Sequence, residues 1–147
     1  MEESDLIGNF GALMGRFLIG TVYIASGIGL VGSFHGVTAM MTGRGIPLPM
    51  LALCLTIAAW LVGGTCVILG WQFRPAASVL FVVSIPVVVG IHWPWSAGTN
   101  AFPDELNHFM QGLAMLGGLA YLAAFGPGRF YIGRTRRNAQ LNVMEAR

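Results

Sequence analysis

The run IPLPMLALCLTIAAWLVGGTCVILGWQFRP, from Ile46 to Pro75, decides the fold. It lies between Arg44 and Arg74, and no charged residue stands between those two arginines. A helix needs about 17–25 mostly apolar residues to cross the roughly 30 Å hydrocarbon core of a bilayer. A proline near the start of the run suits a first helical turn. The sequence therefore predicts a transmembrane helix over residues 47–71.

Charges on both sides of this run leave three further segments of the same kind. They predict spans at about residues 12–34, 75–92 and 104–126. The last span begins near Pro103 and ends at Gly126-Pro127-Gly128, a glycine cap followed by a residue that cannot continue a helix. We therefore expect an all-α fold, an integral membrane four-helix bundle.

The composition agrees with a lipid environment. Hydrophobic residues make up 55% of the chain and charged residues 10%, whereas an ordinary soluble domain has about 25% charged residues. A chain with this few charged residues cannot cover a water-facing surface. We therefore expect membrane lipids around it. The net charge of +2 is too small to indicate a nucleic-acid partner.

The segment between the first two spans is too short to cross the membrane again. Val37, Met40 and Met41 recur there at helical spacing. We predict a short extracytoplasmic helix that lies in the membrane interface.

The arginines are distributed unequally between the two sides of the predicted bundle. With four crossings, both termini and the turn between the second and third spans lie on one side. That side holds Arg16, Arg74, Arg129, Arg134, Arg136, Arg137 and Arg147, and the other side holds Arg44. The positive-inside rule then predicts a multi-pass protein of the cell (inner) membrane with cytoplasmic N- and C-termini. Residues 1–133 form the predicted transmembrane domain, and residues 134–147 a polar basic cytoplasmic tail.

Small residues recur four positions apart on several spans, a spacing that lets helix backbones approach closely in lipid. The predicted packing positions are Gly11, Gly15, Ala25, Gly29, Ala59, Gly63, Ala114 and Gly118. They indicate packing within the bundle, against other membrane subunits, or against a second copy of the chain.

Most residues with functional side chains gather on the predicted extracytoplasmic side. The candidate layer for a quinone or another ligand is His35, His92, His108, Trp93, Trp95 and Arg44. Imidazoles can donate hydrogen bonds to a quinone carbonyl or relay protons. The alternative is a divalent metal, with His35, His92, His108, Asp104 and Glu105 as candidate ligands. A third interpretation is that these are ordinary interfacial residues.

Polar side chains also occur in the part of the predicted spans that lies in the hydrocarbon, but none of them is charged. They are Tyr23, Ser26, Thr56, Thr65, Ser84 and Gln111. The lack of a charge in this part argues against an ion-coupled pump. We expect Ser26 and Gln111 to hydrogen-bond between helices.

Four motifs follow one another along nearly the whole chain. They are GRFLIGTVYIASGI (residues 15–28), GIPLP (45–49), Gly63-Gly64 with ILGWQFRPAA (68–77), and FGPGRFYIG (125–133). In this order they resemble the DoxX family of small bacterial membrane proteins. The resemblance implies a four-helix bundle in the cytoplasmic membrane and an association with redox systems, including a subunit type of thiosulfate:quinone oxidoreductase. Because the family's lysine after SGI and its aspartate-bearing ending after GPGR are replaced here, the resemblance implies the fold and not an activity.

Three functions remain open from the sequence. The first is a non-catalytic membrane subunit or scaffold that packs against a larger redox or energy-converting complex, since no self-sufficient catalytic constellation is visible. The second is a quinone-linked oxidoreductase subunit of the sulfur or thiosulfate oxidation type. The third is a small-solute carrier that works as a homo-oligomer.

Overall fold

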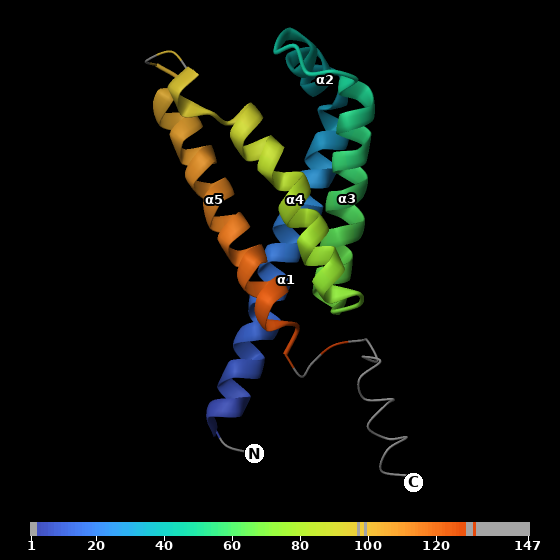
Figure 1. The fold of residues 1–147 in the computed structure, drawn as a ribbon, viewed down its shortest axis with the longest axis vertical. Coiled ribbons are helices and arrows are strands. Elements are labelled where there is room, and N and C mark those ends of the chain that lie inside the picture. Colours follow the sequence, from blue (N-terminus) through green and yellow to red (C-terminus); the bar gives the residue numbers. More distant parts are fainter. Residues whose placement is uncertain (1–2, 97, 99, 129–130, 132–147) are drawn as a thin grey trace.

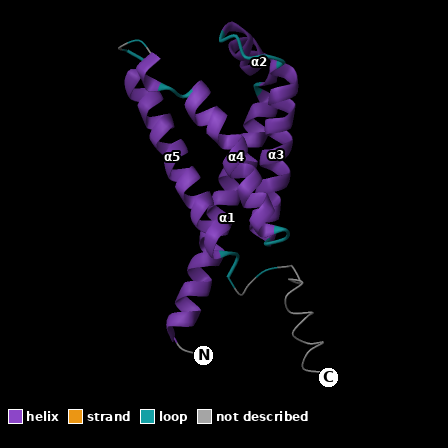
Figure 2. Cartoon of the chain, viewed as in Figure 1, coloured by secondary structure: helices purple, strands orange, loops and turns teal. Residues whose placement is uncertain are grey.

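The structure, a computed structural model, describes residues 3–96, 98, 100–128 and 131. In this part the chain is helical and contains no strand: α1 (Glu3–Gly32), α2 (Phe34–Gly43), α3 (Pro49–Leu69), α4 (Phe73–Ile91), the short 3-10 turn η1 (Pro94–Ser96) and α5 (Phe102–Phe125) (Figures 1 and 2). Helices α1, α3, α4 and α5 are long and apolar enough to cross a membrane. The predicted all-α four-helix membrane bundle is confirmed, and α2 is the short helix predicted between its first two spans.

The helix bounds differ from the predicted spans mainly at the start of the chain. Helix α1 begins at Glu3 and not near residue 12. Its first residues contain no proline, and acidic residues are favourable at a helix N-terminus, so the helix starts before the apolar span does. Pro49 opens α3, and Gly70 ends it with a positive φ of 72°. The predicted tail, residues 134–147, lies outside the described residues.

Helices α1 and α3 approach most closely at a pair of glycines that the packing prediction missed. A Cβ atom on Gly20 would lie 2.8 Å from the carbonyl oxygen of Gly64. A Cβ atom on Gly64 would lie 3.0 Å from the carbonyl oxygen of Gly20. Backbones this close leave no room for a side chain, so these two glycines set the crossing of α1 and α3.

The predicted packing glycines divide into two groups. A Cβ on Gly63 would lie 2.8 Å from Leu80, and one on Gly118 would lie 2.8 Å from Ile19, so both are at helix contacts. Around Gly11, Gly15 and Gly29, in contrast, no atom of the described residues lies within 4 Å of a Cβ. The part of the chain that the structure describes therefore does not pack at these three positions. Ala25 and Ala114 are likewise exposed, and Ala59 is half-buried. The beginning of α1 extends past the ends of the other helices (Figure 1).

One end of the bundle, here called the arginine end, contains the turn between α3 and α4 together with the end of α5. Arg16 is only 1% exposed, and its guanidinium lies 5.9 Å from the centre of the Phe73 ring. Arg74 donates a hydrogen bond to the carbonyl oxygen of Ala124 at 3.4 Å. Beside them lies the buried core, made up of Tyr23, Val67, Phe73, Ala77, Leu80, Leu119 and Leu122.

The other end, here called the histidine end, contains α2, η1, the end of α4 and the start of α5. Helix α4 crosses from α3, where Leu80 meets Gly63, to α5, where Val88 meets Gly112. Helices α1 and α5 meet at Ile19 and Gly118 and then diverge toward this end (Figure 1). The bundle is therefore closed at the arginine end and splayed at the histidine end.

Candidate ligand-binding site

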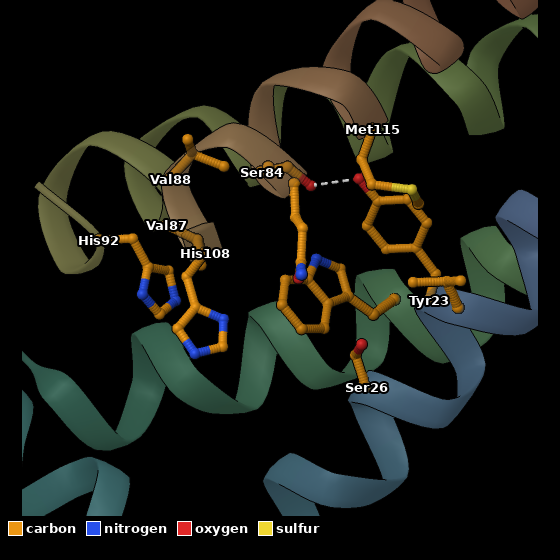
Figure 3. Close-up of a pocket in the computed structure, with 12 residues that line it drawn as sticks. Tyr23, Ser26, Ser84, Val87, Val88, His92, His108 and Met115 are labelled. Carbon is orange, nitrogen blue, oxygen red and sulfur yellow. Dashed lines mark hydrogen bonds between the residues drawn. The ribbon is translucent and has the colours of Figure 1, made fainter. Parts of the chain in front are cut away.

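A cavity of about 150 Å³ lies between all four spans, on the histidine side of the crossing between α1 and α5 (Figure 3). Its polar lining consists of Tyr23, Ser26, Trp60, Ser84, His92, His108 and Gln111. Its apolar lining includes Val22, Val88 and Met115. An engineered apolar cavity of about this volume holds one benzene molecule. The space therefore matches a single six-membered ring.

The inner wall of the cavity is a fixed polar pair. The Tyr23 hydroxyl and the Ser84 Oγ are 2.9 Å apart and share a hydrogen bond in which either can donate (Figure 3). These residues are 5% and 3% exposed. The Tyr23 ring also meets the Trp60 indole edge to face, with 5.6 Å between ring centroids. Because both contacts hold the tyrosine, its hydroxyl has a fixed position in the wall.

Trp60 brings a buried donor to the same wall. Its Nε1 atom is buried, and no group in the described residues accepts its hydrogen bond. An indole N–H can only donate, and a buried donor without an acceptor costs about 1–3 kcal/mol. Because the atom is buried, an acceptor oxygen of a bound molecule reaches it only if neighbouring side chains move.

Two histidines form the other end of the lining (Figure 3). The rings of His92 and His108 have centroids 5.2 Å apart and are tilted by 36°. His92 Nδ1 lies 3.1 Å from Glu105 Oε2. When Nδ1 carries the proton, it donates a hydrogen bond to this carboxylate. The Nε2 atom of the neutral ring is then free to accept a hydrogen bond. The carboxylate thus fixes the orientation of one imidazole in the cavity wall.

Of the predicted ligand layer, the structure places His92 and His108 in the cavity wall and the other four residues elsewhere. His35 is exposed on α2, where its ring meets Phe34 at 6.0 Å. Arg44 donates to the backbone carbonyls of Gly90 and Ile91, so it caps the last turn of α4.

The two predicted tryptophans form a separate aromatic cluster. Trp93 and Trp95 have ring centroids 4.9 Å apart, and both meet Phe109 edge to face. Both indoles are exposed at the histidine end, outside the cavity lining. Their surroundings are those of interfacial aromatic residues.

The metal interpretation receives less support from the geometry. Among the described residues, no three His, Cys, Asp or Glu side chains come together in a group that could hold a metal ion. Of the candidate ligands, His92 lies beside Glu105 and its ring lies beside that of His108. His35 is on α2, and Asp104 is exposed in the first turn of α5. The contacts favour hydrogen bonding over metal coordination at this site.

The sequence contained a signal for the cavity that the prediction did not use. Tyr23 and Ser26 are three positions apart on α1, as are His108 and Gln111 on α5. Residues three or four apart share one face of a helix. Polar residues at this spacing on two otherwise apolar spans indicate two faces that meet at one site. Trp60 gave no such signal because it is a single aromatic residue in an apolar run.

Comparisons with known proteins identify the family. The DoxX family model matches residues 11–93, which is more than half of the chain. Inner membrane protein YphA of Escherichia coli is 25% identical over 122 residues, covering 83% of this chain and 87% of YphA. Inner membrane protein YqjF of the same organism is 29% identical over 126 residues, covering 84% of this chain and 90% of YqjF. No solved structure gives a significant match. The chain belongs to the DoxX family.

Proposed function

We propose that this protein is an inner-membrane protein that binds the ring of a quinone between its four helices and serves as a subunit or partner of a membrane redox system. The observation that carries the proposal is the ring-sized cavity between the four helices, whose lining includes Trp60, a residue with a buried N–H whose hydrogen bond no group in the described part of the chain accepts. The inner-membrane location is supported by the four apolar spans and by the two relatives.

The donors around the cavity suit a ring with carbonyl oxygens at its edges. Trp60 and the Tyr23–Ser84 pair belong to one part of the lining, and His108 with Gln111 to another. Apolar side chains such as Val88 and Met115 cover the remaining lining. An apolar pocket with a few placed polar groups is the usual design of a small-molecule site. A bound quinone would carry electrons and protons, while these residues would bind and orient its ring.

Replacement of Trp60 tests the proposal. Trp60→Phe keeps an aromatic side chain but removes the N–H, so binding of a tailless methoxy-methyl benzoquinone should weaken about fivefold to tenfold, the equivalent of about 1–1.4 kcal/mol. The matched control is Trp71→Phe, because Trp71 is exposed at the turn between α3 and α4. Binding is measured in detergent from the quinone retained with the protein after ultrafiltration. Equal affinity of the Trp60→Phe variant and the wild type would contradict the proposed site.

A role as an accessory subunit is compatible with this site and has its own support. Gly11, Gly15 and Gly29 leave open space on the outside of α1, beside exposed apolar residues such as Phe10 and Phe17. A membrane helix of a partner chain packs well against such a surface. Purification in mild detergent should recover stoichiometric partner chains, and Gly11→Leu with Gly15→Leu should release them. Recovery of the wild-type chain alone, with intact quinone binding, would remove the subunit role.

We also propose that the arginine end faces the cytoplasm. Arg16 and Arg74 lie at this end of the bundle, together with the start of α1 and the end of α5 (Figure 1). Alkaline phosphatase, which is active only outside the cytoplasm, should be inactive when fused after Arg147 and active when inserted after Gly45. The reverse pattern would overturn this orientation.

A further inference from the structure

The cavity has a buried wall and an exposed edge, and different helices supply them. Tyr23, Ser84 and Val88 form the buried wall. On the opposite side, Val22 on α1 is 47% exposed, and Gln111 on α5 is exposed as well. Ser26 on α1 and His108 on α5 are the other exposed members of the lining. The open side of the cavity therefore lies between α1 and α5.

The crossing of these two helices fixes where the opening lies. Helices α1 and α5 are antiparallel and meet at Ile19 and Gly118. Ser26 stands seven residues after Ile19, and Gln111 seven residues before Gly118. At 1.5 Å per residue, each lies about 10 Å from the crossing toward the histidine end. Ser26 on α1 and Gln111 on α5 are thus at the same level of the bundle.

This level lies within the hydrocarbon part of the bilayer. Gln111 is nine residues from the start of α5 at Phe102, or about 14 Å along the helix axis. Ser26 is six residues from the end of α1 at Gly32, or about 9 Å. Half of a bilayer core is about 15 Å thick, so the opening faces acyl chains. Val22 lines it and is exposed, and Met110 and Leu113 on α5 are also exposed, as expected for a surface in contact with lipid.

We propose that the ligand enters and leaves sideways through this α1–α5 opening, and that it is a lipid-soluble molecule whose hydrocarbon tail stays in the bilayer while its ring occupies the cavity. The inference rests on the proposed function and adds the ligand class and its route. A cavity of about 150 Å³ has room for the ring alone. A tail must therefore lie outside, and the opening leads it directly among acyl chains.

Ser26 and Gln111 give this route a polar edge. A hydroxyl and an amide can hydrogen-bond the polar atoms of a ring as it leaves the bilayer. Exposure of such groups to hydrocarbon is unfavourable unless they form hydrogen bonds. Two of them at an exposed edge are therefore consistent with repeated contact with the polar ring of a ligand. A water-soluble ligand would instead enter past His92 and His108 at the end of the bundle.

A bulky side chain at the opening tests the route. Ser26→Phe should weaken binding of a decyl-tailed benzoquinone at least tenfold more than it weakens binding of the tailless ring, because only the tailed molecule needs the opening for its tail. Ser78→Phe is the matched control, because Ser78 is an exposed serine on α4 outside the cavity lining. Gln111→Phe is a second variant that narrows the opening from α5. Thermal unfolding in detergent checks that each variant is folded.

The outcomes separate this inference from the proposed function. If wild-type protein binds both quinones and the Ser26→Phe and Gln111→Phe variants bind the tailed one normally, the lateral route is wrong and the quinone site stands. If both variants lose the tailed and the tailless ring equally, the route is also wrong, since the substitutions then act on the ring site itself. If wild-type protein binds neither quinone, both proposals fall.

Discussion

The arginine end and the histidine end of the bundle use their polar residues in opposite ways. At the arginine end Arg16 is almost completely buried against Phe73, and Arg74 reaches a carbonyl of α5, so the polar groups join elements together. At the histidine end His108 and Gln111 line a cavity beside the buried Trp60 N–H. The arginines at one end contact other parts of the chain, whereas several polar side chains at the other end line a cavity.

Close helix contacts hold the spans together, and one of them lies where the cavity begins. Gly20, Gly63, Gly64 and Gly118 lie at close contacts between spans. The contact of Gly118 with Ile19 is the point from which α1 and α5 diverge. The packed arginine end stabilises the fold. The histidine end can therefore contain a cavity. Four variants test this difference between the two ends, from the largest expected effect to the smallest.

Truncation of Arg16 should give the largest loss of stability. Arg16→Ala removes a fully buried long side chain and leaves a cavity beside Phe73, so we expect the free energy of unfolding to fall by about 2–5 kcal/mol. Arg74→Ala is the control, because Arg74 is exposed and makes one long hydrogen bond. Thermal or denaturant unfolding in detergent measures both variants. Equal effects of the two substitutions would show that the closed end does not depend on the buried arginine.

A methyl group at the α1–α3 crossing should have the next largest effect. Gly20→Ala places a Cβ 2.8 Å from the Gly64 carbonyl oxygen, and overpacking of this kind costs about 1–3 kcal/mol. Gly29→Ala adds the same methyl on the same helix where nothing lies within 4 Å, so it should be neutral or slightly stabilising. The two melting temperatures give the comparison. A Gly20→Ala variant as stable as Gly29→Ala would contradict the close crossing.

Loss of the Arg44 cap should loosen the histidine end alone. Arg44→Gln removes the charged donor to the carbonyls of Gly90 and Ile91, the residues that precede His92. We expect stability to fall by about 1 kcal/mol, since the arginine is exposed, and quinone binding to weaken a few-fold because His92 is less well positioned. His35→Ala, an exposed change at the same end, serves as control. Unchanged binding by Arg44→Gln would mean that this cap does not position His92.

Removal of the hydrogen bond between Tyr23 and Ser84 should have the smallest effect on stability. Ser84→Ala leaves the Tyr23 hydroxyl without its partner, and hydrogen bonds between membrane helices average about 0.6 kcal/mol. Ser78→Ala on the exposed side of α4 is the matched control. A loss above about 2 kcal/mol on unfolding would indicate that Ser84 belongs to the packing of the closed end and not to the binding site.

The spacing of charges predicted the four spans because the bilayer imposes a length on any charge-free helix. The rule did not predict the contacts of Arg16, which was expected on the cytoplasmic side of the first span and whose side chain is buried against Phe73. The choice between Gly20 and Gly11 as packing positions was not predictable, since small residues at similar spacing occur on both faces of α1. That choice depends on how the helices cross.

The site was predicted only in part for the same reason. His92 and His108 were expected to lie in one layer, and they do lie side by side. His35 has the same chemistry, but the direction of α2 places it elsewhere. The spacing of Tyr23 with Ser26 and of His108 with Gln111 indicates two polar helix faces. The cavity between them also depends on the divergence of α1 from α5 and on the orientation of the Trp60 ring, which local periodicity does not predict.

The most direct test of the binding site uses Trp60 as its own probe. In a variant in which Trp71, Trp93 and Trp95 are replaced by Phe, all indole fluorescence comes from Trp60. Titration with a decyl-tailed benzoquinone in proteoliposomes should quench this fluorescence saturably, and the tailless ring should compete. Quenching that rises linearly with quinone concentration, without saturation or competition, would reflect quinone dissolved in the surrounding lipid and would contradict a quinone site between the helices.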